Sequence, residues 1–405
     1  MELFFLYKKS FSGLSRDVWA LALIYLVNRC GEMVIPFMSV FLTNQLGFSK
    51  TQTGVVLTCY GLGAMCGSNI GGYLTDSIGN FRVMAVSLAG AGTAFIGIIF
   101  FKTFYALSAW LFLTAVFSSM FSPAAFSAVS IWGVPENKTR GFSLLRMAIN
   151  LGVAIGPAVG GFLAYKVGYN WLFIVDGVTC YLALITLFIV LKHRNEKPEK
   201  IADEHLVKET PYRDKILLLF LFFNLINMLA FFQILFSVPV YFKEVMMLDE
   251  MWIGLFFTVN GLLVFLLEMP IVYKIEQKNN YFKPMVSGAI MIGLAYASLS
   301  IFNNAIAAIF FYSIFLAVGE VVNFPLIPSL AVRRADEQNH GKYMGVVSMM
   351  FAVAFVLSPM LGLPVVEKIG FHAYFYCAAV LSIMSGICLW YLKPYFQIEN
   401  TKEGK

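Results

Sequence analysis

The sequence predicts an all-α integral membrane protein with twelve transmembrane helices arranged in two pseudo-symmetric six-helix bundles. Of its 405 residues, 59% are hydrophobic and 13% are charged, whereas about a quarter of the residues in soluble domains are charged. Apolar runs of about 20 residues recur along the chain, and each is long enough to cross a hydrocarbon core of about 30 Å as a helix. One polar segment near the middle separates two equal sets of these runs.

The twelve apolar runs define the expected helices in order. The first is too long for the apolar part of a cleavable signal peptide, and no small-residue cleavage pattern follows it, so we expect it to remain as helix one. Prolines inside several runs remove a backbone donor and bend the helix. Neighbouring helices, side chains or water can bond the backbone groups that are left free at membrane depth. The expected spans are 17–45, 51–75, 83–101, 104–133, 142–166, 170–192, 214–244, 250–273, 283–301, 305–333, 342–366 and 371–392.

The domain organisation follows from the polar segment 193–213, whose charges alternate and whose residues include Pro198 and Pro211. Such a segment hardly inserts, so we expect a cytoplasmic linker between an N-terminal bundle, 1–192, and a C-terminal bundle, 214–405, that ends in a short cytoplasmic tail. Matching residues recur at a nearly constant offset, which indicates duplication of a six-helix unit. The offset is 202 for Pro123/Pro325 and Pro157/Pro359, and 200 for Gly54/Gly254 and Gly61/Gly261.

The distribution of Lys and Arg predicts the orientation. If the N-terminus is cytoplasmic, 22 of the 29 basic residues fall on the cytoplasmic side, five fall outside, and Arg29 and Arg146 lie within spans. Both termini are therefore expected in the cytoplasm, with the chain in the inner or plasma membrane. The net charge of +6 then reflects topology rather than nucleic-acid binding.

This orientation is testable by labelling. With Glu199→Cys in the linker, an impermeant thiol reagent added to intact cells should give no labelling above that of the native cysteines. Lys102→Cys, in a loop expected outside, should be labelled and serves as the control. Efficient labelling at position 199 in intact cells would contradict the predicted topology.

Charged residues inside the spans are the strongest functional signal. A carboxylate or guanidinium at the bilayer centre costs roughly 2.5–3.5 kcal/mol on insertion scales, so it needs a partner, a proton or a water-filled cavity. Glu320 lies near the middle of helix ten, and Arg29 and Glu32 lie three residues apart near the middle of helix one. Alternating exposure of such an acid changes its proton occupancy. The expected proton-coupling residues are Glu320, Glu32 and Glu268.

Each of these charges also has a structural interpretation. Glu32 and Arg29 could form a permanent ion pair, because residues at i and i+3 share a helix face. Glu320 has no same-helix cation within one turn, which favours function. Glu268, near the cytoplasmic end of helix eight, fits either gating or bonding of an exposed helix end. Asp176 in helix six is expected to be structural, and Arg146 is expected to snorkel.

Polar side chains within the spans are the candidates for contact with a substrate. Together with the charged pair they predict an amphipathic cavity lining. The abundance of aromatic residues is weak evidence for a hydrophobic substrate, because most of them must face lipid or pack between helices. The expected substrate-binding residues are Arg29, Glu32, Asn28, Asn224, Asn227, Gln233, Asn260 and Asn323.

The sequence contains no motif of another class of function. The sequence has no phosphate-cradling glycine loop, nucleophile triad or metal cluster, which argues against an ATP-driven pump and against an enzyme. The six cysteines lie inside spans and are expected to be packing residues without disulfides. We therefore expect no cofactor, no metal and no nucleic-acid partner. The expected partners are a small-molecule substrate, protons and the lipid bilayer, with the protein as a monomer.

A segment after the second span resembles a known signature. Residues 72–82 read GYLTDSIGNFR, which is similar to G-x-L-x-D-R-x-G-R-K, the motif between helices two and three of the major facilitator superfamily. Gly72, Asp76 and Gly79 match, the basic positions at 77, 80 and 81 do not, and Arg82 is a substitute. The resemblance implies the fold of that superfamily and a loop that locks the cytoplasmic ends of the two halves. The structural alternative is a loop that caps a neighbouring helix.

A second motif lies in helix five. Residues 152–161 read GVAIGPAVGG, which resembles the glycine-proline signature of the superfamily's antiporters. Small residues at this spacing allow helices to approach closely and slide. The resemblance assigns Gly152, Gly156 and Pro157 to the conformational gate with the residues of the first motif. Close helix packing alone is the alternative.

The comparison with subfamilies leaves the substrate open. Drug–proton antiporters carry a buried arginine in helix four, but residues 112–129 have no charge, and Arg29 is the nearest substitute. Proton-coupled oligopeptide transporters have E-x-x-E-R in helix one, which residues 29–32 do not match, and an acid in helix ten, which Glu320 does. The expected function is proton-coupled secondary transport by alternating access, exporting small amphipathic compounds. The alternatives are import of peptides or other polar nutrients, and a non-transporting receptor.

Overall fold

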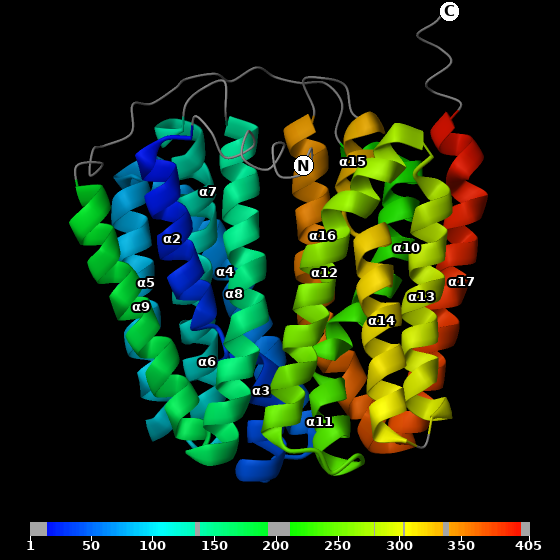
Figure 1. Ribbon diagram of the computed structural model, residues 1–405, viewed down its shortest axis with the longest axis horizontal. Coiled ribbons are helices and arrows are strands. Elements are labelled where there is room, and N and C mark those ends of the chain that lie inside the picture. Colours follow the sequence, from blue (N-terminus) through cyan, green and yellow to red (C-terminus); the bar gives the residue numbers. More distant parts are fainter. Residues whose placement is uncertain are drawn as a thin grey trace, which may run out of the picture. The chain divides into compact units, whose positions relative to one another are not determined.

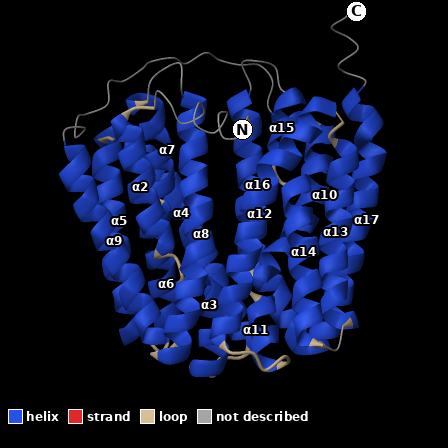
Figure 2. Ribbon diagram, viewed as in Figure 1, coloured by secondary structure: helices blue, strands red, loops and turns tan. Residues whose placement is uncertain are grey.

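The computed structural model describes residues 14–133, 138–192, 211–278, 280–302, 304–334 and 340–397. Within these ranges the chain is helical apart from short connections (Figure 2). Eleven helical stretches of this part are long and apolar enough to cross a membrane. The remaining predicted span, 51–75, lies within a 29-residue helix, α4 (Lys50–Ile78).

The helices of the first half are drawn from blue to green in Figure 1. Span one is interrupted, and span four consists of two helices separated by Met120. In order the helices are α2 (Arg16–Cys30), α3 (Val34–Val40), α4 (Lys50–Ile78), α5 (Asn80–Gly97), α6 (Phe104–Ser119), α7 (Phe121–Trp132), α8 (Lys138–Lys166) and α9 (Tyr169–Leu191).

The second half repeats this plan, from green to red in Figure 1. Its first span is again interrupted, and its fourth again consists of two helices. In order they are α10 (Lys215–Phe231), α11 (Ser237–Glu244), α12 (Glu250–Lys278), α13 (Phe282–Ile301), α14 (Ala305–Asn323), α15 (Leu326–Arg334), α16 (His340–Ile369) and α17 (Phe371–Gln397).

The chain forms two compact units. Unit 1 contains residues 1–46, 55–202 and 249–258, and unit 2 contains residues 47–54, 203–248 and 259–405. The chain passes from one to the other between residues 202 and 203, inside the predicted linker, of which 193–210 lie outside the described residues. Each unit thus includes a short segment from the half of the chain that forms the other unit.

The two exchanged segments make matching contacts at repeated positions. In unit 1, a Cβ on Gly254 would lie 3.1 Å from the carbonyl carbon of Pro157. In unit 2, a Cβ on Gly54 would lie 2.6 Å from the carbonyl oxygen of Pro359. Both members of each contact belong to the pairs that recur in the sequence at offsets of 200 and 202. The shared contact supports the inference of duplication.

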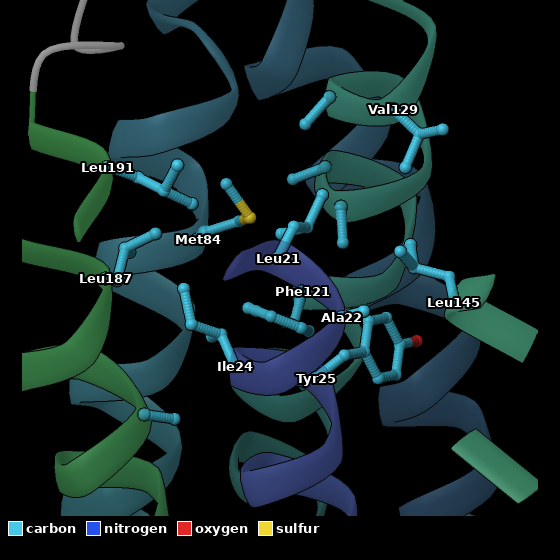
Figure 3. Close-up of a cluster of buried hydrophobic side chains, with 14 of the residues drawn as sticks. Leu21, Ala22, Ile24, Tyr25, Met84, Phe121, Val129, Leu145, Leu187 and Leu191 are labelled. Atoms are coloured by element: carbon cyan, nitrogen blue, oxygen red, sulfur yellow. The ribbon is translucent and has the colours of Figure 1, made fainter. Parts of the chain in front are cut away.

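The core of unit 1 is a cluster of apolar side chains around α2 (Figure 3). Leu21 and Ile24 pack in it with residues of α5, α7 and α9, and Tyr25, whose side chain is buried, places its hydroxyl at the edge. Lipid is as apolar as these side chains, so their contribution comes from close packing rather than from leaving water. The cluster fixes α2 directly before the point where helix one breaks.

Candidate functional site

Helix one breaks next to its charged residues. The α-helix α2 ends at Cys30, residues 31–33 form a turn, and α3 begins at Val34. Pro36 explains the position of the break, because proline has no N–H to bond the carbonyl of Glu32 and its ring clashes with that carbonyl. Arg29 therefore lies in the last turn of α2 and Glu32 in the turn itself.

Arg29 and Glu32 form a salt bridge, and Arg29 also contacts one residue of its own helix and one of α7. The Arg29 guanidinium also donates to the Tyr25 hydroxyl at 3.2 Å and to the Ser122 hydroxyl of α7 at 3.1 Å. Tyr25 and Ser122 are themselves 2.6 Å apart. The side chains of Arg29 and Glu32 are 21% and 24% exposed. Tyr25 and Ser122 therefore hold the guanidinium by hydrogen bonds, and both side chains of the pair remain partly exposed.

The glycines of the helix-five motif lie against this pair. A Cβ on Gly152 would be 3.0 Å from the carbonyl carbon of Arg29, and one on Gly156 would be 3.2 Å from the carbonyl oxygen of Cys30. One turn on, a Cβ on Gly160 would be 2.8 Å from the Cβ of Met33. Because these three residues are glycines and have no Cβ, the backbone of α8 can lie close to helix one along the break. Pro157, within the same motif, contacts Gly254 as described above.

This close approach predicts the effect of a larger residue. Gly152→Val should push α8 away from Arg29 and lower the apparent Tm by about 3–10 °C, since overpacking typically costs about 1–3 kcal/mol. Val153→Leu, at an exposed position of the same helix, should leave Tm unchanged. Thermal unfolding of the purified variants in detergent measures both, and equal Tm values would contradict a tight contact.

Glu320 lies at a second helix break, in unit 2. It is in the last turn of α14, which ends at Asn323, and α15 begins at Leu326 after two turn residues. Pro325 and Pro328 account for this interruption because neither has a backbone donor. Glu320 is half-buried, and its carboxylate forms no ion pair with a cation in the described part of the chain. An acid in this position is costly when charged.

Glu268 is the other half-buried acid in this part of unit 2. It lies on α12, close enough to Glu320 for the two carboxylates to act on each other electrostatically. Like charges at short range disfavour simultaneous ionisation. The structure therefore brings two of the three expected proton-coupling residues into one unit, while Glu32 lies in the other.

The expected substrate-binding amides lie at buried helix contacts. Five of them donate to groups of the protein, among them Asn28 to the Cys180 sulfur at 3.7 Å, Asn224 to Phe220 O at 2.9 Å, Asn227 to Ser385 Oγ at 2.6 Å and Gln233 to Ser358 O at 2.7 Å. Asn323 donates to Met285 O at 3.2 Å. Within the described residues, the side-chain oxygens of Asn224, Asn227, Gln233, Asn260 and Asn323 accept no hydrogen bond. Buried acceptors of this kind are normally satisfied. Their role toward a substrate stays a prediction.

The expected loop 72–82 is not a loop, and this part of the sequence interpretation was wrong. Helix α4 continues to Ile78 and α5 begins at Asn80, so Gly79 alone connects them, with φ of +93°. Glycine adopts this conformation without steric cost, which allows both helices to extend to the connection. Gly72 and Asp76 therefore lie on α4, and Arg82 is exposed on α5. The Asp76 side chain lies outside the described residues, so its gating role stays a prediction.

The break of helix one involves residues that the sequence interpretation did not assign to a site. Tyr25 and Ser122 hold Arg29, although nothing in their apolar surroundings distinguishes them in sequence. Ser122 does precede Pro123, which marks the interruption of helix four. Asp176, expected to be structural, lies on α9 against the same break. Arg146 is exposed on α8.

Comparison with known proteins places the chain among transporters. The model of the Major Facilitator Superfamily matches residues 21–341 and 283–405. The uncharacterized MFS-type transporter YttB of Bacillus subtilis is 26% identical over 361 residues, covering 86% of this chain and 88% of that relative. The multi-drug resistance efflux pump PmrA of Streptococcus pneumoniae is 24% identical, with 92% and 94% covered. The Na(+), Li(+), K(+)/H(+) antiporter of Planococcus maritimus is 22% identical, with the same coverage.

Solved structures show the same fold. A crystal structure of a POT family transporter in complex with 5-aminolevulinic acid superposes with a TM-score of 0.79. The match covers 95% of this chain and 98% of that chain, at 17% sequence identity. At this level of identity the similarity concerns the fold alone. It confirms the predicted all-α membrane architecture.

Proposed function

The chain belongs to the Major Facilitator Superfamily, and on that premise we propose that it exports small amphipathic compounds in exchange for protons. Members of the family are secondary transporters rather than enzymes, and the protein is a multi-pass membrane protein. Two distant relatives, an antiporter with H(+) and a multidrug efflux pump, support antiport and efflux. The plasma membrane, with cytoplasmic termini, is the proposed location.

The main observation in support of proton coupling is the environment of Glu320. Its carboxylate is half-buried at a helix break, and the described cations of unit 2 form no ion pair with it. A membrane-embedded acid without a cation is stable when protonated and costly when charged. Exposure to water on one side of the membrane favours release of the proton. Alternating access then couples the protonation of Glu320 to the state of the transporter.

The charges within the spans of each unit support a cationic or neutral amphipathic substrate. The Arg29 guanidinium is paired with Glu32, so this pair contributes little net charge. In unit 2, the half-buried acids Glu320 and Glu268 favour a positive group on a ligand. Tyr25 places an aromatic ring beside the pair, with its centroid 5.2 Å from the Arg29 guanidinium carbon. Planar lipophilic cations are suited to such surroundings.

Import of peptides is the second candidate. It is favoured by the acid in helix ten, Glu320, which matches the oligopeptide transporters in position. A peptide has both an ammonium and a carboxylate group, and Arg29 would have to leave Glu32 to bind the carboxylate. The salt bridge between them therefore favours the cationic substrate over the peptide.

Transport by purified protein in liposomes distinguishes the two. Liposomes are loaded at acidic pH and diluted into neutral buffer that contains either ethidium, a planar lipophilic cation, or dialanine. A proton antiporter should accumulate ethidium as protons leave, and should move no dialanine. With the gradient reversed, ethidium accumulation should stop. Accumulation of dialanine driven by inward proton flow would instead establish the importer.

A further inference from the structure

Asp176 is the most deeply buried of the described carboxylates near helix one, and the mechanism above gives it no role. It lies on α9 and is 1% exposed. Its two oxygens accept from the backbone N–H groups of Met33 and Val34, at 3.3 and 3.1 Å. These bonds join segments more than 140 residues apart in the sequence. They end on the two residues at which helix one resumes after its break.

The break creates a need for this acceptor. Backbone donors at the start of a helix have no partner within the helix, and no side chain caps α3 at Met33. The Met33 N–H also donates to the carbonyl of Gly31 within the turn, at 2.7 Å, whereas the Val34 N–H donates to Asp176. Leaving a buried N–H unpaired is destabilising. Asp176, on the neighbouring helix α9, accepts from the N–H groups of both Met33 and Val34.

Other residues of α9 hold the opposite side of the break. The Thr179 hydroxyl donates to the carbonyl of Asp176 at 2.9 Å, and a Cβ on Gly31 would lie 2.8 Å from the Cβ of Thr179. The next residue, Cys180, accepts from Asn28 in the last turn of α2. The segment 176–180 therefore contacts helix one before, at and after the turn 31–33.

We propose that Asp176 is a positioning residue, whose carboxylate fixes the break of helix one so that Arg29 and Glu32 meet. Arg29 precedes the turn and Glu32 lies within it, so the shape of the turn sets their separation. A neutral residue of similar size fills the same space but does not accept both N–H groups. The consequence for transport depends on the proposed function, whereas the effect on the local backbone does not.

Hydrogen–deuterium exchange of the purified protein in detergent tests the local effect. In Asp176→Asn, one oxygen remains as acceptor, and the amides of residues 31–35 should exchange about tenfold faster than in wild type, as expected for loss of one buried bond. Asp176→Leu should give a larger increase at the same residues. Peptides of unit 2 should exchange at the wild-type rate.

A matched control lies on the same helix. The Thr186 hydroxyl donates to the carbonyl of Leu182 in its own helix, at 2.8 Å, so Thr186→Val should leave exchange at residues 31–35 unchanged. Wild-type exchange at these residues in both Asp176 variants would overturn the proposal. So would a uniform increase throughout unit 1 in Asp176→Asn, because it would indicate a general loss of packing.

Ethidium transport provides the readout that a purely structural role does not move. Asp176→Asn should raise the KM for ethidium about tenfold, the loss expected for one buried hydrogen bond, with little change in maximal rate. If Asp176 acts through the Arg29–Glu32 pair, adding Asp176→Asn to the double variant Arg29→Gln/Glu32→Gln should change the KM for ethidium no further. Full additivity would contradict the positioning role. Absence of ethidium transport in wild type would refute the proposed function and leave the exchange result to decide this inference.

Discussion

Glu320→Gln is expected to abolish proton-driven accumulation of ethidium while preserving exchange of ethidium across the membrane. Glutamine retains the size of the side chain and much of its hydrogen bonding, but it does not titrate. A transporter that cannot change its charge at this position should carry substrate down its own gradient only. Liposomes with and without a pH gradient measure accumulation and exchange in the same preparation.

The matched comparisons for this variant are two other acids. Asp249→Asn replaces an exposed acid directly before α12 and should transport as wild type does. Glu268→Gln removes the neighbouring carboxylate, and it should alter the pH dependence of accumulation without abolishing it. Undiminished accumulation by Glu320→Gln would eliminate Glu320 as the coupling residue and leave Glu32 or Glu268 as the candidate.

Glu32→Gln should weaken ethidium binding strongly, because it leaves the Arg29 guanidinium without its carboxylate. Breaking a fully buried pair costs about 3–5 kcal/mol. This pair is about one-fifth exposed, so water screens part of the loss, and we expect affinity to fall at least about tenfold. The unpaired cation also repels a cationic ligand. Equilibrium binding of ethidium to the purified protein measures the change.

The double variant Arg29→Gln/Glu32→Gln is the control for this prediction. It removes both charges together, so no unpaired guanidinium remains, and replacing a buried pair by neutral residues is often tolerated. Its affinity for ethidium should therefore exceed that of Glu32→Gln alone. An affinity below that of the single variant would show that Arg29 itself attracts the ligand. Peptide import would then become the better account.

Sequence patterns were sufficient for the fold because they report properties of individual segments. The length and apolarity of each run set the spans, and Pro36 and Pro325 mark positions where helices one and ten break. The spacing of Arg29 and Glu32 was enough to give their pairing as one of two interpretations, and the structure shows the pair. Composition and periodicity carry such information without knowledge of which helices are neighbours.

Contacts between distant segments could not be predicted from the sequence. Ser122 and Asp176 reach helix one from positions 93 and more than 140 residues away, and no pattern in a single sequence encodes that proximity. The one-residue connection at Gly79 was missed for a different reason. Gly72 and the polar residues after it are typical of a loop, but the left-handed conformation of Gly79 allows a reversal without one.

Proton movement during transport is the most direct test of the central claim, that substrate and protons are exchanged. Liposomes that contain wild-type protein and an internal pH dye are mixed with ethidium in the absence of a pH gradient. Entry of ethidium should make the interior more alkaline, as protons leave in exchange. Glu320→Gln should admit ethidium with no pH change. Ethidium entry without proton movement in wild type, or equal proton movement in the variant, would contradict the account.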